Sequence, residues 1–252
     1  MVLLEAKDLV KRYGGRTVVD HVSITVNQGE IVGLLGRNGA GKTTTFRMTI
    51  GMITPNNGTV FFEGVEVTRM PMFKRARRGI GYLSQEPSIF QRLTVRQNIL
   101  AIMETMSLPR RERRERCDQL LDQFGLTRMS GQLARTLSGG ERRKLEIARA
   151  LVTNPMMILL DEPFSGVDPI AVEDLQHEIR GLKDRGISIL LTDHNVRETL
   201  TVTDRSYIID NGKVFREGRP RDLINDELVR KTYLGHTFRG DEFDGASAPI
   251  GM

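Results

Sequence analysis

An apolar segment that runs straight into a glycine-rich loop is the feature that most constrains this chain. Residues 31–35 are all aliphatic or glycine, and the run Gly36-Arg37-Asn38-Gly39-Ala40-Gly41-Lys42-Thr43 follows at once. The segment predicts a buried strand, and residues 43–51 are typical of a helix. A G-x-x-x-x-G-K-T loop between a strand and a helix favours phosphate binding, because its glycines let successive backbone N–H groups point at an anion.

This loop predicts the phosphate contacts of a nucleotide. The following helix adds a favourable dipole at its N-terminus, Lys42 reaches the β- and γ-phosphates, and the Thr43 hydroxyl ligates Mg²⁺. A chance match would arise in about one chain of this length in a hundred, and the strand-loop-helix context makes chance rarer still. We therefore assign ATP binding to this set: Gly36, Arg37, Asn38, Gly39, Ala40, Gly41, Lys42, Thr43 and Thr44.

A second chemical signal is the run Ile158-Leu159-Leu160-Asp161-Glu162. An apolar strand that ends in acids places both carboxylates at its carboxyl edge, where open α/β sheets bind ligands. The alternative is an acidic turn after a core strand, and the phosphate loop makes that alternative the weaker one. We expect Asp161 to be a Mg²⁺ ligand, and Glu162 to orient and deprotonate the attacking water.

The order of the predicted elements indicates the fold class. Short strands are predicted near the N-terminus, a mostly helical segment covers residues 87–155, and strands alternate with helices from residue 157 onward. This order predicts a mainly parallel sheet with helices on both faces. In the helical segment, one buried helix face is predicted for Cys117, Leu120, Leu121 and Phe124. The basic run at 110–116 could touch phosphate or lipid, but a solvated helix face is the favoured interpretation.

Composition excludes several classes of protein. No segment approaches the roughly 20 apolar residues that cross a bilayer, and Glu5, Lys7 and Asp8 interrupt any signal-peptide pattern near the start. The single cysteine excludes an internal disulfide. We therefore expect a soluble, cytoplasmic protein. The net charge of +5 would suit nucleic acid or anionic lipid, but the basic residues are spread along the chain, which favours ordinary surface chemistry.

The stretch Leu137-Ser138-Gly139-Gly140-Glu141 lies between the two phosphate motifs. Ser138 is expected to cap a helix with Glu141 three residues later, in a capping box. The two glycines leave backbone N–H groups uncovered at a positive helix end, where an anion can approach. A well-capped helix with no ligand is the alternative interpretation.

The same stretch resembles the signature of ABC transporter ATPases, and the resemblance extends over residues 2–238. It implies an α/β fold of the ABC ATPase type: a P-loop NTPase core of the RecA-like kind, an antiparallel β subdomain and an inserted α-helical subdomain, in a single domain over residues 1–239. Tyr13 then matches the aromatic that stacks on adenine, Gln85 the glutamine that senses Mg²⁺ and the membrane partner, and His194 the switch histidine. Residues 165–168 look like the D-loop. Residues 240–252 are expected to form a disordered tail.

Within the family, the stretches around residues 75–95, 137–151, 158–170 and 190–200, with a late YLGHTF, are most similar to lipopolysaccharide-export ATPases. Arg37 and Ser84 stand where proline is usual, and Ser165 where alanine is usual. The resemblance implies hydrolysis of ATP with Mg²⁺. It also implies a homodimer in which Ser138, Gly139, Gly140 and Glu141 of one subunit contact the ATP held by the other. The catalytic set would be Glu162, His194 and Gln85, and the metal ligands Thr43, Gln85 and Asp161.

The partners implied are integral inner-membrane subunits of the LptF, LptG and LptC type, with the chain peripheral on the cytoplasmic face of that membrane. A groove near Phe90 and Arg92 would receive them, unless Phe90 is a core residue. No nucleic acid and no direct contact with the transported molecule are expected. One alternative is the ATPase of another transporter, such as a branched-chain amino-acid importer. A soluble ABC protein acting on DNA or ribosomes, or a P-loop kinase, fits less well.

Overall fold

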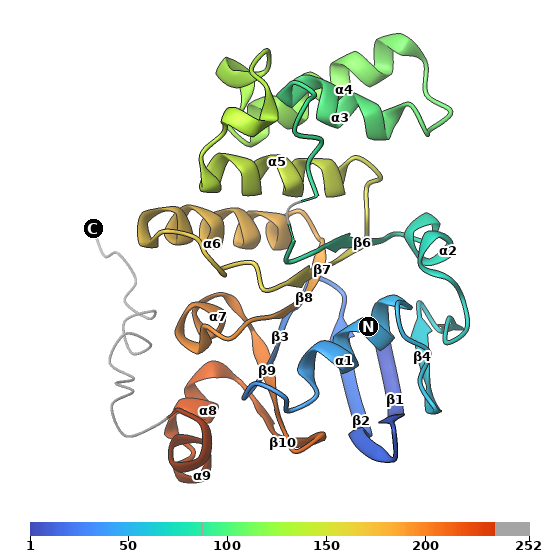
Figure 1. Ribbon diagram of the computed structural model, residues 1–252, viewed down its shortest axis with the longest axis vertical. Helices are drawn as coiled ribbons and strands as arrows, with labels where there is room; N and C mark the ends of the chain where they lie inside the picture. The colour runs from blue at the N-terminus through green and yellow to red at the C-terminus, as the bar shows by residue number, and fades with distance from the viewer. Residues whose placement is uncertain (87, 235–252) are drawn as a thin grey trace.

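The computed structural model describes residues 1–86 and 88–234 and contains two β-sheets with helices around them (Figure 1). The smaller sheet is antiparallel, with the strand order β2-β1-β4-β5. Its strands are Val2–Tyr13 (β1), Arg16–Asn27 (β2), Asn57–Phe62 (β4) and Val65–Glu66 (β5). The predicted strands near the N-terminus are therefore confirmed.

The larger sheet has the strand order β10-β9-β3-β8-β7-β6 and is parallel except for β10. Its strands are Ile31–Gly36 (β3), Ile80–Leu83 (β6), Met157–Asp161 (β7), Ser188–Thr192 (β8), Arg205–Asp210 (β9) and Lys213–Gly218 (β10). The central strands β3, β7 and β8 are buried along their whole length, as expected where helices cover both faces of a parallel sheet. Their carboxyl ends meet at one edge.

Alternate residues of the central strands pack on opposite faces of this sheet. Val32 and Leu34 belong to a hydrophobic cluster with α1 (Lys42–Ile50) and the smaller sheet, so α1 lies between the two sheets. Ile189 and Leu191 point the other way and pack with α5 (Gly139–Leu151) and α6 (Pro169–Asp184). Because the side-chain period of a strand is two, the fully apolar strands serve both layers.

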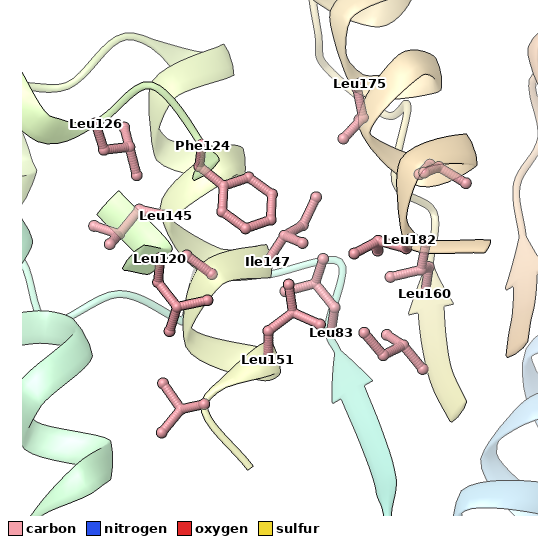
Figure 2. Close-up of a cluster of buried hydrophobic side chains, with 14 of the residues drawn as sticks. Leu83, Leu120, Phe124, Leu126, Leu145, Ile147, Leu151, Leu160, Leu175 and Leu182 are labelled. Carbon is pink, nitrogen blue, oxygen red and sulfur yellow. The ribbon is translucent and has the colours of Figure 1, made fainter. Parts of the chain in front are cut away.

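The helical segment between β6 and β7 contains α3 (Val95–Met103), α4 (Arg110–Gln123) and α5, with short 3₁₀ turns at Thr127–Met129 and Ala134–Thr136. Cys117, Leu120, Leu121 and Phe124 are buried together, which confirms the predicted helix face. Figure 2 shows Ile147 and Leu151 of α5 between Leu120 of α4 and Leu182 of α6. The helical segment and the sheet therefore share one hydrophobic cluster.

Most of the basic run at 110–116 is solvent-exposed, as the favoured interpretation predicted, although Arg113 and Arg116 are half-buried. Arg111 forms an exposed ion pair with Glu115. Among the described residues, no helix combines the length and the apolar character needed to span a bilayer. The predicted tail (240–252) and most of the YLGHTF stretch lie outside the described residues.

Four short helical elements were not predicted from the sequence: α2 (Met72–Arg77), the C-terminal α8 (Pro220–Asn225) and α9 (Glu227–Val229), and the π-helical turn Arg230–Leu234. Arg75 of α2 is almost fully buried, and its guanidinium donates to the carbonyls of Met48 and Thr49 at the end of α1. Burial lowers the pKa of Arg75 to about 10. The C-terminal helices, with α7 (Val196–Val202), cover the edge of the sheet near β9.

Candidate active site

The phosphate loop joins β3 to α1, as predicted, and two of its glycines are required by close contacts. A Cβ atom at Gly36 (φ +149°) would lie 2.2 Å from the carbonyl oxygen of Ile209, and one at Gly41 (φ +107°) would lie 2.7 Å from that of Val18. Gly41 is also the N-cap of α1 and has no side chain to cap it. The first N–H groups of α1 therefore remain available to an anion.

Lys42 lies folded back over its own loop and is only 6% exposed. Its Nζ donates to the carbonyls of Gly36 at 2.5 Å and Arg37 at 3.0 Å. Burial lowers the pKa of Lys42, and the nearby carboxylates of Glu162 and Asp193 oppose that shift. The ammonium group is thus held at the loop, where a phosphate oxygen would replace carbonyls as its partner. Thr43 and Thr44 are half-buried at the start of α1, and Arg37, Asn38 and Gly39 are exposed.

Asp161 is the last residue of β7 and is buried. Its carboxylate accepts a long hydrogen bond, 3.4 Å, from the hydroxyl of Tyr82 on the neighbouring strand β6. Burial raises the pKa of Asp161, and the positive charge of Arg47 opposes the shift. No cluster of three or more His, Cys, Asp or Glu side chains within residues 1–86 and 88–234 could hold a metal ion unaided. A buried carboxylate with one long hydrogen bond fits Mg²⁺, which takes its other ligands from phosphate and water.

Three predicted catalytic residues meet at one carboxylate. Gln85 Nε2 donates to Glu162 Oε2 at 2.8 Å, and His194 Nδ1 lies 3.2 Å from the same oxygen. The three residues follow β6, β7 and β8, so the shared carboxyl edge of parallel strands brings them together. Glu162 has a positive φ of +47°, which is uncommon for a residue with a side chain. Its N–H donates to the carbonyl of Thr192 at 2.7 Å, which holds this backbone in place.

The predicted capping box at the start of α5 is present. Glu141 N–H donates to Ser138 Oγ at 3.3 Å, and Ser138 N–H donates to Glu141 Oε2 at 2.8 Å. Gly139 is exposed and lines a pocket with Gln85 and Glu162. A separate pocket contains Ser138 and Gly140. Residues 138–141 therefore cap α5 and also line surface pockets that a ligand can reach.

The remaining predicted residues lie away from Glu162. Tyr13 ends β1 and is 48% exposed, with Lys11 Nζ 5.3 Å from the centre of its ring. Phe90 is 45% exposed and is not a core residue. The guanidinium of Arg149 lies 4.6 Å from the centre of the Phe90 ring, a cation–π contact. Arg92 is also exposed, so a basic and aromatic surface follows the segment that carries Gln85.

A buried ion pair, which the sequence pattern did not predict, holds the Gln85 segment. Arg143 and Glu146 of α5 are joined at 2.9 Å. Arg143 Nη1 donates to the Ser84 carbonyl at 3.1 Å, and Glu146 Oε1 accepts from the Ser88 N–H at 2.9 Å. The available signal was a charged pair three residues apart on the buried side of an amphipathic helix, which resembles a surface pair in the sequence alone.

Two further contacts were also missed. Asp193 is fully buried between the Glu162 and His194 segments, and accepts hydrogen bonds from the N–H groups of Phe164 and Asn195. Tyr233, in the π-helical turn, accepts from the Gly36 N–H at 3.0 Å through its hydroxyl. An acid directly before His194 at a strand end was a usable signal for the first contact, whereas nothing in the sequence pattern pointed to the second.

The sequence of this chain matches known proteins of one family. A family model described as ABC transporter matches residues 19–165. The lipopolysaccharide export system ATP-binding protein LptB of Haemophilus influenzae is 51% identical over 240 residues, covering 95% of this chain and 100% of the relative. LptB of Escherichia coli K12 is 50% identical over the same shares.

Solved structures agree with the sequence relatives. An ATP-binding cassette of an ABC transporter in its ADP conformation matches with a TM-score of 0.84 at 30% identity, covering 93% of this chain and 99% of that one. A nucleotide-free cassette matches with a TM-score of 0.83 at 30% identity, covering 93% and 100%. The expected fold class is confirmed, and the chain belongs to the ABC transporter family as one of its ATP-binding, ATP-hydrolysing cassettes.

Proposed function

We propose that this ATPase powers lipopolysaccharide export, by hydrolysing ATP at the phosphate loop while bound to membrane subunits that carry the cargo. Support for the cargo comes from relatives named as LptB that match almost the whole chain at 50–51% identity. Support for the chemistry comes from the convergence of Gln85 and His194 on the carboxylate of Glu162, at the sheet edge where β3 also ends. The convergence on Glu162 is the observation on which the proposed mechanism rests.

The residues divide the chemistry between charge and positioning. The N–H groups of the loop and Lys42 bind the phosphates and neutralise their charge. Glu162 orients the attacking water and accepts its proton, and Gln85 and His194 fix the direction of that carboxylate. Thr43, Asp161 and Gln85 would hold Mg²⁺, which supplies further charge neutralisation at the phosphates when bound. Tyr13, exposed at the end of β1, would stack on the adenine.

A head-to-tail homodimer would complete each site. α1, which follows the phosphate loop, and α5, which follows Ser138-Gly139-Gly140, pack on opposite faces of the larger sheet. One nucleotide held by the loop is therefore poorly placed to contact the same subunit's α5 start. A second copy would bring the exposed backbone of its Ser138-Gly139-Gly140 stretch to the phosphates, so that ATP joins two subunits and hydrolysis releases them. ATP then acts as the ligand that biases a two-state assembly.

The membrane partners would be inner-membrane proteins of the LptF, LptG and LptC type, with this chain peripheral on the cytoplasmic face. The exposed surface of Phe90 and Arg92 follows the Gln85 segment, so a helix docked there would lie close to the residues that position Glu162. Contact with the partner and contact with the catalytic carboxylate would then be linked through a few residues of chain. The transported molecule itself would be bound by the partners.

Two measurements test the proposal. Glu162→Gln keeps the size and a hydrogen-bonding group but removes the base, so it should bind ATP, dimerise and barely turn over; full turnover would remove Glu162 from this role. Arg92→Glu should weaken recovery of the membrane subunits from detergent-solubilised membranes and leave ATP binding unchanged. Arg111→Glu, on the solvated side of α4, is the charge-matched control. If the chain instead recovers the membrane subunits of an amino-acid importer, the proposed lipopolysaccharide cargo is wrong.

A further inference from the structure

The carboxylate of Asp193 is buried next to the candidate site and has no role in the mechanism proposed above. It is fully buried directly after β8, where its carboxylate accepts two backbone hydrogen bonds and lies beside His194. A carboxylate taken out of water without a cation is costly, so buried acids are retained where several hydrogen bonds or a function require them. Asp193 precedes His194 directly, and both lie at the sheet edge that carries Glu162.

The two oxygens of Asp193 serve two different segments. Oδ2 accepts from the Phe164 N–H at 2.9 Å, two residues after Glu162. Oδ1 accepts from the Asn195 N–H at 2.9 Å, one residue after His194, and lies 3.4 Å from His194 Nδ1. A single side chain therefore bridges the segment that carries the candidate base to the segment that carries the candidate histidine.

The backbone around Glu162 explains why such a bridge matters. Glu162 has φ +47°, a strained conformation for a residue with a side chain, which persists only when its surroundings enforce it. The Glu162 N–H to Thr192 carbonyl bond fixes one side of this residue, and the Asp193 to Phe164 bond fixes the chain just beyond it. Serine or asparagine at 193 offers one good acceptor to these two donors, whereas a carboxylate offers two.

The charged groups around Asp193 also favour a carboxylate at this position. Burial raises the pKa of Asp193, while the Asn195 and Phe164 N–H groups and His194 favour the charged carboxylate. The Asp193 carboxylate also acts on Lys42, whose pKa it raises against the effect of burial. Asp193 therefore lies within electrostatic reach of the loop lysine as well as of His194.

We propose that Asp193 is a positioning residue for ATP hydrolysis, holding Glu162 and His194 in register through its two backbone hydrogen bonds. The inference rests on the proposed roles of Glu162 and His194 and adds a buried residue that acts through the backbone next to them. The two hydrogen bonds of Asp193 fix the direction of the Glu162 carboxylate, which serves hydrolysis, and not the backbone of the phosphate loop, which binds ATP.

The test compares Asp193→Asn and Asp193→Ser in the full-length chain with Mg-ATP as substrate. In Asp193→Asn, one carboxylate oxygen becomes an NH₂ group, which faces one of the two backbone N–H donors and cannot accept its hydrogen bond. In Asp193→Ser, the shorter side chain can accept from the Asn195 N–H but loses the hydrogen bond from the Phe164 N–H. A misplacement of about 1 Å can cost about a hundredfold in rate, so kcat should fall roughly 10- to 100-fold. The KM for ATP and equilibrium ATP binding should change far less than kcat, because the loop N–H groups and Lys42 remain in place to bind the phosphates.

Asp204→Asn is the control. Asp204 accepts from the Ile31 N–H at 2.9 Å at the opposite end of β3, so it makes a comparable bond away from the site; it should leave kcat unchanged. A second readout is the cycle with His194→Ala, in which the Asp193→Asn effect on kcat should shrink because one of the two positioned groups is already gone.

The outcomes separate this inference from the proposed mechanism. If Glu162→Gln is inactive but both Asp193 variants fold and keep normal kcat, Asp193 does not position the site and the base assignment survives. If Glu162→Gln turns over normally, the base assignment fails independently. A fall in ATP binding that matches the fall in kcat, or loss of folding in both Asp193 variants, would make Asp193 a determinant of the fold and overturn the proposal.

Discussion

Gln85 and Glu162 are 77 positions apart in the chain, yet the amide of one donates to the carboxylate of the other at 2.8 Å. The bond connects the end of β6, which leads toward the exposed surface of Phe90, to the end of β7, where the phosphate chemistry is expected. His194 contacts the same oxygen from β8. A shift of the segment after β6 therefore changes a hydrogen bond of the catalytic candidate directly.

Changes at Gln85 should lower kcat according to the charge they introduce. Gln85→Ala removes one of the two groups that direct Glu162, and should lower kcat by about tenfold. Gln85→Glu places a like charge beside Glu162 and should lower kcat further, because both carboxylates cannot be accommodated at this distance without cost. Steady-state ATPase assays of the three proteins measure the order. Equal activity of Gln85→Glu and the parent chain would contradict it.

Ser138→Ala separates helix capping from nucleotide contact. Loss of the cap should cost about 1 kcal/mol of unfolding free energy. Thr94 makes the same kind of capping box with Gln97 at the start of α3, so Thr94→Ala is a matched control with a similar stability cost. Only Ser138→Ala should also lower ATPase activity. Denaturant unfolding measures the stability of both variants, and ATPase assays measure their activity. Equal ATPase activities of the two variants would show that Ser138 only caps the helix.

Gly36→Ala should abolish ATP binding and destabilise the chain, because its Cβ would lie 2.2 Å from the Ile209 carbonyl oxygen. Gly39 also has a positive φ, +79°, but a Cβ there meets open space. In the nucleotide-free chain, Gly39→Ala should therefore cost only the backbone strain, about 1 kcal/mol of unfolding free energy. Equilibrium binding of ATP and thermal unfolding distinguish the two variants. Similar behaviour of both would show that close packing against β9 is unimportant.

The Glu30–Arg205 pair predicts how stability depends on pH. Burial favours a raised pKa for Glu30, but the Arg205 guanidinium at 2.8 Å and the Asn27 N–H prevail and lower it. The pair therefore stabilises the fold above the unfolded glutamate pKa of about 4.3, and this contribution is lost as pH falls through the lower, folded value. Glu30→Gln should cost roughly 2 kcal/mol at pH 7. It should also flatten the acid side of the stability profile, measured by urea unfolding between pH 7 and 3.

Much of the site could be predicted because its geometry follows from strand order. Residues placed directly after parallel strands must meet at one edge, so Gln85, Glu162 and His194 could be grouped from the sequence. The capping box at Ser138 and the buried face of α4 follow from local periodicity in the same way.

Contacts that depend on packing at a distance could not be predicted. Arg143 and Glu146 look like a surface pair, yet α5 buries them against the Gln85 segment. The hydroxyl of Tyr233 reaches the Gly36 N–H across nearly two hundred residues of chain. α2 was missed because its six residues, three of them basic, are too few to show an apolar periodicity.

The burial of Arg75 has a mechanical consequence for α1. Its guanidinium holds the last carbonyls of that helix, while the phosphate loop lies at the other end. With its far end anchored to α2, α1 has little freedom to slide along its axis when a nucleotide arrives or leaves. We therefore expect α1 to keep its position during the ATP cycle, and the segments that carry Gln85 and His194 to move relative to it.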